Sequence, residues 1–123
     1  MILKFINEQM SQIAVNYEFN EWTSAVKYPY FVGEITEDEP QTEDGAENAT
    51  IILTGFHRGQ YIELEKAKEK IKNHFNPILG LRAKTDSGAI AVFFSGAFNI
   101  PSGEADLKKI QINLKVKTWK GVL

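Results

Sequence analysis

The segment Lys108–Thr118 constrains the fold most, because its apolar and polar residues alternate almost without a break. Aliphatic side chains occupy every second position, namely Ile110, Ile112, Leu114 and Val116. Successive side chains of a strand point to opposite faces, so this pattern predicts a half-buried antiparallel strand. Its outer face is polar and carries lysines. A chain with such a strand must build a sheet that has one face on a core.

Further segments are rich in β-branched and aromatic residues and are predicted to be strands: Tyr28–Ile35, Ala49–His57, Leu79–Thr85 and Ala89–Phe98. The last is apolar on both faces, with Ile90, Val92, Phe94 and Phe98 on one and Ala89, Ala91, Phe93 and Ala97 on the other. This pattern is typical of a central strand that is covered on both sides. Gly96 within it indicates a bulge, and Asp86-Ser87-Gly88 before it indicates a hairpin turn.

Two amphipathic helices complete the predicted fold. Residues Ile2 to about Asn16 form the first, and Ile62 to about His74 form the second, which ends before Pro77. The intervening Tyr17–Lys27 is expected to be a transition segment. The predicted order is therefore α-β-β-α-β-β-β, an α+β fold in which an antiparallel sheet carries both helices on one face.

Length and composition indicate one globular domain over residues 1–123, because 123 residues suit a single core. The chain has no cysteine, which excludes disulfides, thiolate zinc sites and a cysteine nucleophile. No apolar run approaches the ~18 residues of a membrane span, and Met1–Ile6 is interrupted too soon for a signal peptide. We therefore expect a protein made in the cytoplasm without a membrane partner.

Acidic residues are concentrated between Glu34 and Glu47, where seven carboxylates occur without a lysine or arginine. The part at about 36–48 contains Pro40 and Gly45 and has no apolar periodicity, so it is predicted to be an irregular loop between two strands. A loop this acidic is either a solvated hairpin tip or a surface that meets something basic.

The net charge of −2 conceals an excess of the opposite sign elsewhere. Without the seven carboxylates the balance is 14 basic against 16 − 7 = 9 acidic residues, and five lysines fall in the last sixteen residues. Patches of opposite sign favour association between copies, whereas the alternative is that both only solubilise the surface. The candidate interface residues are Glu37, Asp38, Glu39, Glu43, Asp44, Glu47, Lys115, Lys117 and Trp119.

No residue pattern indicates catalysis, a metal or a cofactor. His57 and His74 lie in different predicted elements without ligand spacing, so we expect structural roles, with the His74 cation suited to a helix end. The acidic run lacks the spacing and central glycine of an EF-hand. Gly55–Gly59 lacks both phosphate-loop motifs and is interpreted as a turn. Lysines beside Trp119 in an acidic chain do not indicate specific nucleic-acid binding.

Several local sequences occur in a recognisable order: Tyr28-Pro-Tyr-Phe-Val-Gly-Glu, a polar loop, Ala49-Thr-Ile-Ile-Leu-Thr-Gly-Phe, the helix Ile62–Phe75, Leu79-Gly-Leu, a hairpin and the closing strand Gln111–Trp119. This order resembles that of the tail-completion and tail-terminator proteins of long-tailed bacteriophages. The resemblance spans about Ile2 to Trp119. The acidity of Glu34–Glu47 is not a requirement of that family.

The resemblance implies an α+β virion protein without enzymatic activity, assembled as a ring, commonly of six copies, at the head-proximal end of the tail tube. Its implied partners are further copies of itself, the tail-tube protein and the head connector, and the acidic loop would contact a basic surface on one of them. Two alternatives remain open. One is another phage neck or tail-tube subunit. The other is a small bacterial ligand-binding domain or enzyme, which a deep apolar pocket with converging polar groups would favour.

Overall fold

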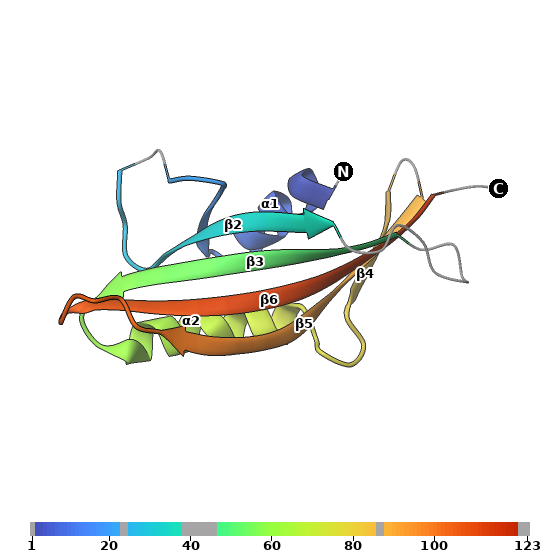
Figure 1. The fold of residues 1–123 in the computed structure, drawn as a ribbon. Coiled ribbons are helices and arrows are strands. Elements are labelled where there is room, and N and C mark those ends of the chain that lie inside the picture. The colour runs from blue at the N-terminus through green and yellow to red at the C-terminus, as the bar shows by residue number, and fades with distance from the viewer. Residues whose placement is uncertain (1, 23–24, 38–46, 86–87, 121–123) are drawn as a thin grey trace.

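The computed structural model describes residues 2–22, 25–37, 47–85 and 88–120. Two helices and six strands follow one another in the order α-β-β-β-α-β-β-β, and the strands form a strongly curled half-barrel (Figure 1). The elements are α1 (Ile2–Gln12), β1 (Asn16–Phe19), β2 (Tyr30–Glu37), β3 (Glu47–Arg58), α2 (Tyr61–His74), β4 (Leu81–Thr85), β5 (Gly88–Ile100) and β6 (Leu107–Lys120).

The strands form one mixed sheet in the order β1-β2-β3-β6-β5-β4. Strand β1 runs parallel to β2, and every other neighbouring pair is antiparallel. The α+β class is confirmed, whereas the prediction of a purely antiparallel sheet in the order α-β-β-α-β-β-β is wrong. The sequence prediction lacked β1, which lies where a helix end and a transition segment were expected.

Strand β1 depends on its neighbours rather than on a local pattern. Its four residues are too few for a periodic signal. The Tyr17 ring packs against the core at Gly33 of β2, where any Cβ atom would overlap it. Burial raises the pKa of Tyr17 to about 12.

Helix α1 ends earlier than predicted because the chain reverses direction at Ala14. Ala14 adopts a left-handed conformation with φ of 57°. The Val15 amide donates to the Met10 carbonyl at 3.0 Å, and the Ala14 amide donates to the Ser11 carbonyl at 3.1 Å. This pair of hydrogen bonds is a Schellman motif, which normally uses glycine at the position of Ala14. The other predicted elements begin and end within two residues of the observed ones.

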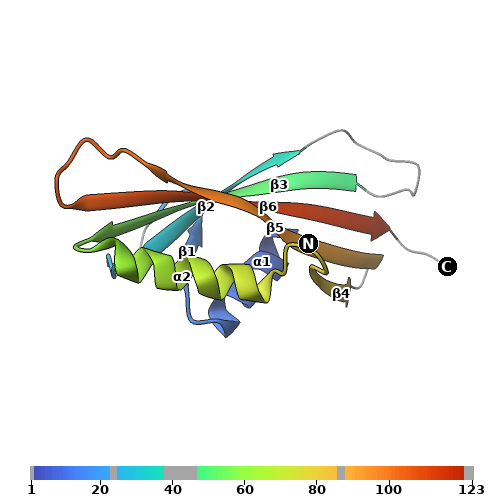
Figure 2. The same cartoon turned by 90° about the horizontal axis from the view of Figure 1, so that it is seen from below.

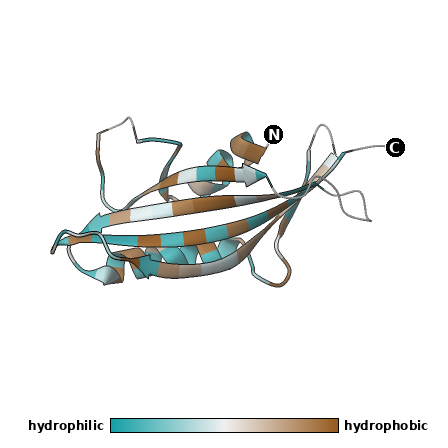
Figure 3. Ribbon diagram, viewed as in Figure 1, coloured by the Kyte–Doolittle hydropathy of each residue, from teal (hydrophilic) through white to brown (hydrophobic). Residues whose placement is uncertain are grey.

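The core lies between the two helices and one face of the sheet, here called the helix-covered face. Ile6 and Met10 of α1 and Leu64 and Ile71 of α2 belong to the same buried cluster as the inward-pointing strand residues. Figure 2 shows both helices on one side of the sheet, and Figure 3 shows the alternation of apolar and polar residues along β6. The other face, here called the open face, carries no helix among the described residues.

A β-bulge in β5 changes which face its later residues occupy. The pairing of β5 with β6 shifts register between Phe94 and Gly96, so the predicted bulge is present. An extra residue reverses the alternation beyond it. Ala97 therefore packs against the core, and Phe98 is 53% exposed on the open face. The prediction that Phe98 shares the core face of Ile90 is wrong.

Helices α1 and α2 are joined by a hydrogen bond in which His74 Nε2 lies 2.7 Å from Gln9 Oε1. His74 lies in the last turn of α2, as predicted. Burial lowers its pKa, however, which opposes the cationic form that the helix end alone would favour.

This lowered pKa predicts a loss of stability in mild acid. The unfolded chain binds a proton at a higher pH than the folded chain does, so the contribution of His74 is complete above about pH 6.5 and declines below it. Urea unfolding at about pH 7.5 and about pH 5.5 should show a larger loss for the wild type than for His74→Gln. Equal losses for the two proteins would contradict this assignment.

Candidate functional site

The predicted interface residues fall into three groups. Asp38, Glu39, Glu43 and Asp44 lie outside the described residues. Glu37 ends β2 and Glu47 begins β3. Lys115, Lys117 and Trp119 lie on β6.

Strand register assigns Glu37 and Glu47 to one face of the sheet and Lys115 and Lys117 to the other. Glu47 pairs with Thr118, which is buried on the helix-covered face, and a Glu47 carboxylate oxygen lies 3.8 Å from Lys120 Nζ. Cross-strand partners share a face. Lys115 and Lys117 occupy the alternate positions of β6 and belong to the open face. The structure thus brings Glu47 together with Lys120 at the end of the sheet.

The open face of β6 is polar, as the sequence predicted. Gln111 Nε2 donates to Asn113 Oδ1 at 3.2 Å, and Lys115 Nζ donates to Thr50 Oγ1 of the neighbouring strand at 3.3 Å. The alternate residues of β6 are buried: Ile110, Ile112, Leu114 and Val116. This strand therefore combines a core face with a hydrogen-bonding, basic face.

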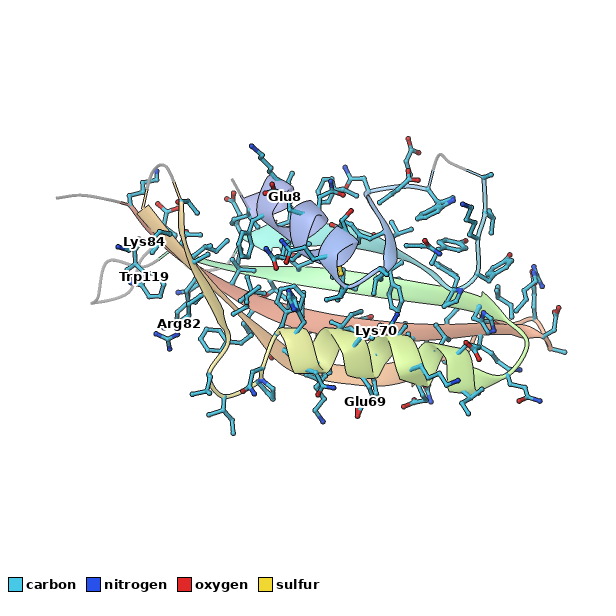
Figure 4. The ribbon with its side chains drawn as sticks, turned by 180° about the vertical axis from the view of Figure 1, so that it is seen from behind. Glu8, Glu69, Lys70, Arg82, Lys84 and Trp119 are labelled. Carbon is cyan, nitrogen blue, oxygen red and sulfur yellow. The ribbon has the colours of Figure 1, made fainter. Side chains whose placement is uncertain are left out.

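Trp119 lines a shallow, open cavity of about 330 Å³ at the end of the sheet where β4, β5 and β6 lie side by side. We call this cavity the tryptophan pocket, and its lining comprises Arg82, Ala83, Lys84, Ala89, Ile90, Ala91 and Trp119. Figure 4 shows Arg82, Lys84 and Trp119 gathered at this end. Trp119 is among the interface residues predicted from the sequence, whereas its neighbours are not, because they come together only through strand pairing.

The register explains the shape of the tryptophan pocket. Ala89 pairs with Lys84 on one side and with Trp119 on the other. Ala91 likewise pairs with Arg82 and with Lys117. Small side chains on the middle strand with long ones on both flanking strands leave a depression with an apolar floor. The cationic side chains of Arg82 and Lys84 and the indole ring of Trp119 surround that floor.

The cations of the tryptophan pocket are not neutralised within the described residues. Arg82 Nε donates to the Leu79 carbonyl at 3.1 Å, which fixes the guanidinium near the pocket. No carboxylate of the described residues forms a salt bridge with Arg82 or Lys84. The pocket therefore suits an anionic group attached to an apolar one.

An ordered turn beside the pocket exposes two large aliphatic side chains, Ile78 at 82% and Leu79 at 68%. Asn76 Oδ1 accepts hydrogen bonds from the amides of Ile78 at 2.8 Å and Leu79 at 2.9 Å. The sequence prediction assigned Leu79 to a strand, although the Asn76–Pro77 dipeptide is a turn signal that could have identified it. The result is an exposed apolar contact surface.

Ion pairs, a hydrogen bond and aromatic contacts join the loops at the opposite end of the sheet. Arg58 lies 3.0 Å from Asp106 and 3.1 Å from Glu104, and its Nε donates to the Tyr28 hydroxyl at 3.3 Å. Tyr30 stacks on Phe56 with ring centroids 5.0 Å apart. Exposed ion pairs of this kind contribute ~0–1 kcal/mol each. These residues fix the loops at that end.

A second cavity of about 200 Å³ lies between α2 and the segment that joins α1 to β1. Phe31 and Ala67 line it together with the charged Glu63, Lys66 and Lys70. Small-molecule sites usually measure roughly 300–1,000 Å³ and place polar groups around an apolar centre. This cavity is smaller than that range, whereas the tryptophan pocket reaches its lower end but is open rather than deep.

Within the described ranges, no group of three or more histidine or carboxylate side chains is placed to hold a metal ion. The two helices of this part of the chain are too short and too polar to cross a bilayer.

Comparison with protein-family models finds no matching model, and comparison with curated proteins finds no match.

Proposed function

We propose that this chain is a non-enzymatic virion protein of a long-tailed bacteriophage, which caps the tail tube and joins the tail to the head as an oligomeric ring. Its partners in this proposal are further copies of itself, the tail-tube protein and the head connector, and it needs no cofactor. The proposal is supported by the sequence resemblance over Ile2–Trp119 and by the α+β fold, which agrees with that family. The protein would be made in the host cytoplasm and reside in the tail or neck of the virion.

The observation that carries the proposal is the separation of charge between the faces of the sheet. A ring requires a heterologous interface, in which one patch of a subunit meets a different patch of the next. Glu37 and Glu47, which flank the part of the acidic segment outside the described residues, have the register of the helix-covered face, whereas Glu34, Lys115 and Lys117 have that of the open face. A neighbouring copy, the tube protein or the connector can therefore place an acidic surface against the lysines or a basic surface against the carboxylates. Each exposed pair adds ~0–1 kcal/mol, so affinity has to come from many pairs around a ring.

Electron microscopy of particles from a phage that lacks this gene tests the proposal. Filled heads beside unjoined or overlong tails are the expected result. Overlong tails would favour termination, and unjoined tails of normal length would favour joining or the alternative role of a neck subunit. Normally joined tails of normal length would reject the proposal.

Reversing the charge of Lys115 and Lys117 to glutamate should reduce the number of joined particles by at least about tenfold, because the loss is repeated in every subunit. The double variant Lys4→Glu and Lys70→Glu makes the same change of charge on exposed helical positions and serves as the matched control. Circular dichroism checks that both variants fold. Equal numbers of joined particles from the two variants would contradict a role for the basic open face.

A further inference from the structure

The tryptophan pocket has the shape of a receptor for a side chain of a protein segment. Its floor is made by the small side chains Ala89 and Ala91, and Trp119 forms one wall. An indole face beside an apolar floor packs well against an aliphatic or proline side chain. A volume of about 330 Å³ gives room for one or two such side chains.

The charge around the pocket specifies the chemistry of the segment. Arg82 and Lys84 flank the floor from β4, and Lys117 is the register neighbour of Ala91 on β6. Cations that lack salt-bridge partners among the described residues attract carboxylates and raise the rate of encounter with an acidic partner. The complementary segment is therefore acidic and includes an apolar residue.

The chain itself contains a segment of that chemistry. Seven carboxylates without a cation lie between Glu34 and Glu47, and Pro40 and Ala46 lie among them. Strand β3, which follows this segment, is separated from β4 by β6 and β5. Glu37 and Glu47 also belong to the helix-covered face, whereas the pocket residues Lys84, Ala89 and Trp119 share the open face. A second copy can present its acidic segment to the open face directly.

We infer that the tryptophan pocket binds the acidic segment of a second copy of this chain, with Arg82 and Lys84 pairing with its carboxylates and Trp119 packing on an apolar residue. This inference rests on the proposed function for the claim that copies meet in an assembly, and it names the surface at which they meet. Binding itself is a property of the isolated chain.

Titration of a synthetic peptide with the sequence of residues 36–48 tests the inference. The receptor is the full chain carrying Trp22→Phe, so that Trp119 is its only tryptophan. The expected result is a saturable change in Trp119 fluorescence that weakens as salt is raised, because exposed charge pairs are screened. A peptide with glutamine and asparagine in place of the acids should produce no such change.

The variant Arg82→Glu with Lys84→Glu should bind the peptide at least about tenfold more weakly. Arg82→Gln with Lys84→Gln removes the charge without reversing it and should also weaken binding, which keeps the test valid if the first variant does not fold. Lys4→Glu with Lys70→Glu should leave the affinity unchanged. The absence of saturable binding overturns the inference. This holds even if the cause is that the acidic segment of the same chain fills the pocket, because the inference assigns the pocket to a second copy. Equal affinity in the Arg82 and Lys84 variants overturns it as well.

A single-stranded oligonucleotide is the competing ligand, because an indole ring and cations also bind bases and phosphates. Saturable binding of the oligonucleotide without binding of the peptide would assign the pocket to nucleic acid and overturn the inference. Failure of the pocket inference is distinguishable from failure of the proposed function. Peptide binding with normal tails in the gene deletion would reject only the function, and a joining defect without peptide binding would reject only the pocket.

Discussion

Replacing Phe31 with alanine is expected to lower the free energy of unfolding by about 3–5 kcal/mol, because it removes a large buried ring and leaves a hole. Phe31 is fully buried and is the second residue of β2. Its ring lies over Gly55 of β3, which has no side chain to fill the space, and it lines the cavity of about 200 Å³ beside α2. The hole would join that cavity rather than collapse. A domain of this size has only about 5–15 kcal/mol of stability in total, so the variant should be close to unfolding.

Equilibrium unfolding in urea measures this loss, and Phe98→Ala is the matched control. Phe98 is the same residue type on a strand of the same sheet, but 53% of it is exposed. Its truncation should cost less than about 1 kcal/mol, because little apolar area returns to water. Equal losses for the two variants would mean that Phe31 is not a centre of the core.

Replacing Gly55 with alanine is expected to lower the free energy of unfolding by about 1–3 kcal/mol through overpacking. The backbone of Gly55 is an ordinary part of β3, so the effect does not arise from its conformation. An added Cβ would overlap the Phe31 ring and lie 2.9 Å from Ile110 Cγ2. Both neighbours are buried in the core, so relief of the overlap requires their side chains to shift within it.

A double-mutant cycle tests whether the cost of Gly55→Ala comes from the Phe31 ring. In the Phe31→Leu background the overlap with the ring is removed, so the cost of Gly55→Ala should fall below about 1 kcal/mol. Contacting residues couple in this way, whereas independent ones add. If the free-energy changes of the two substitutions are additive in the cycle, the cost of Gly55→Ala comes from a contact other than the Phe31 ring.

Local patterns in the sequence were sufficient to predict most of the fold. The alternation of β6 identified its buried and polar faces residue by residue, because a two-residue period leaves little choice of face. Features that depend on distant partners were missed. Strand β1 exists through the packing of Tyr17 at Gly33, and Ala14 adopts a conformation that sequence patterns associate with glycine. The position of Phe98 was predicted on the wrong face because the bulge reverses the alternation after Phe94.

The candidate site was predictable only in part. The lysines on the open face follow from local alternation, and Trp119 followed from the end of the same pattern. Arg82 and Lys84 become neighbours of Trp119 only through the pairing of three strands around Ala89 and Ala91. No local signal predicts such a register. The interface roles of Asp38, Glu39, Glu43 and Asp44 stay predictions, since these residues lie outside the described ranges.

The bulge in β5 has a further consequence for solubility. Strand β4 pairs with β5 only as far as Val92, and the Phe94 amide donates to the Phe75 carbonyl at 2.8 Å. Beyond that point, no described strand pairs with the outer edge of β5, and Ser95–Ile100 contains no charged side chain. An uncharged open edge is a template for uncontrolled strand stacking. The bulge lies where this edge begins, and a bulge bends and twists its strand, which makes an edge a poorer template for a second strand.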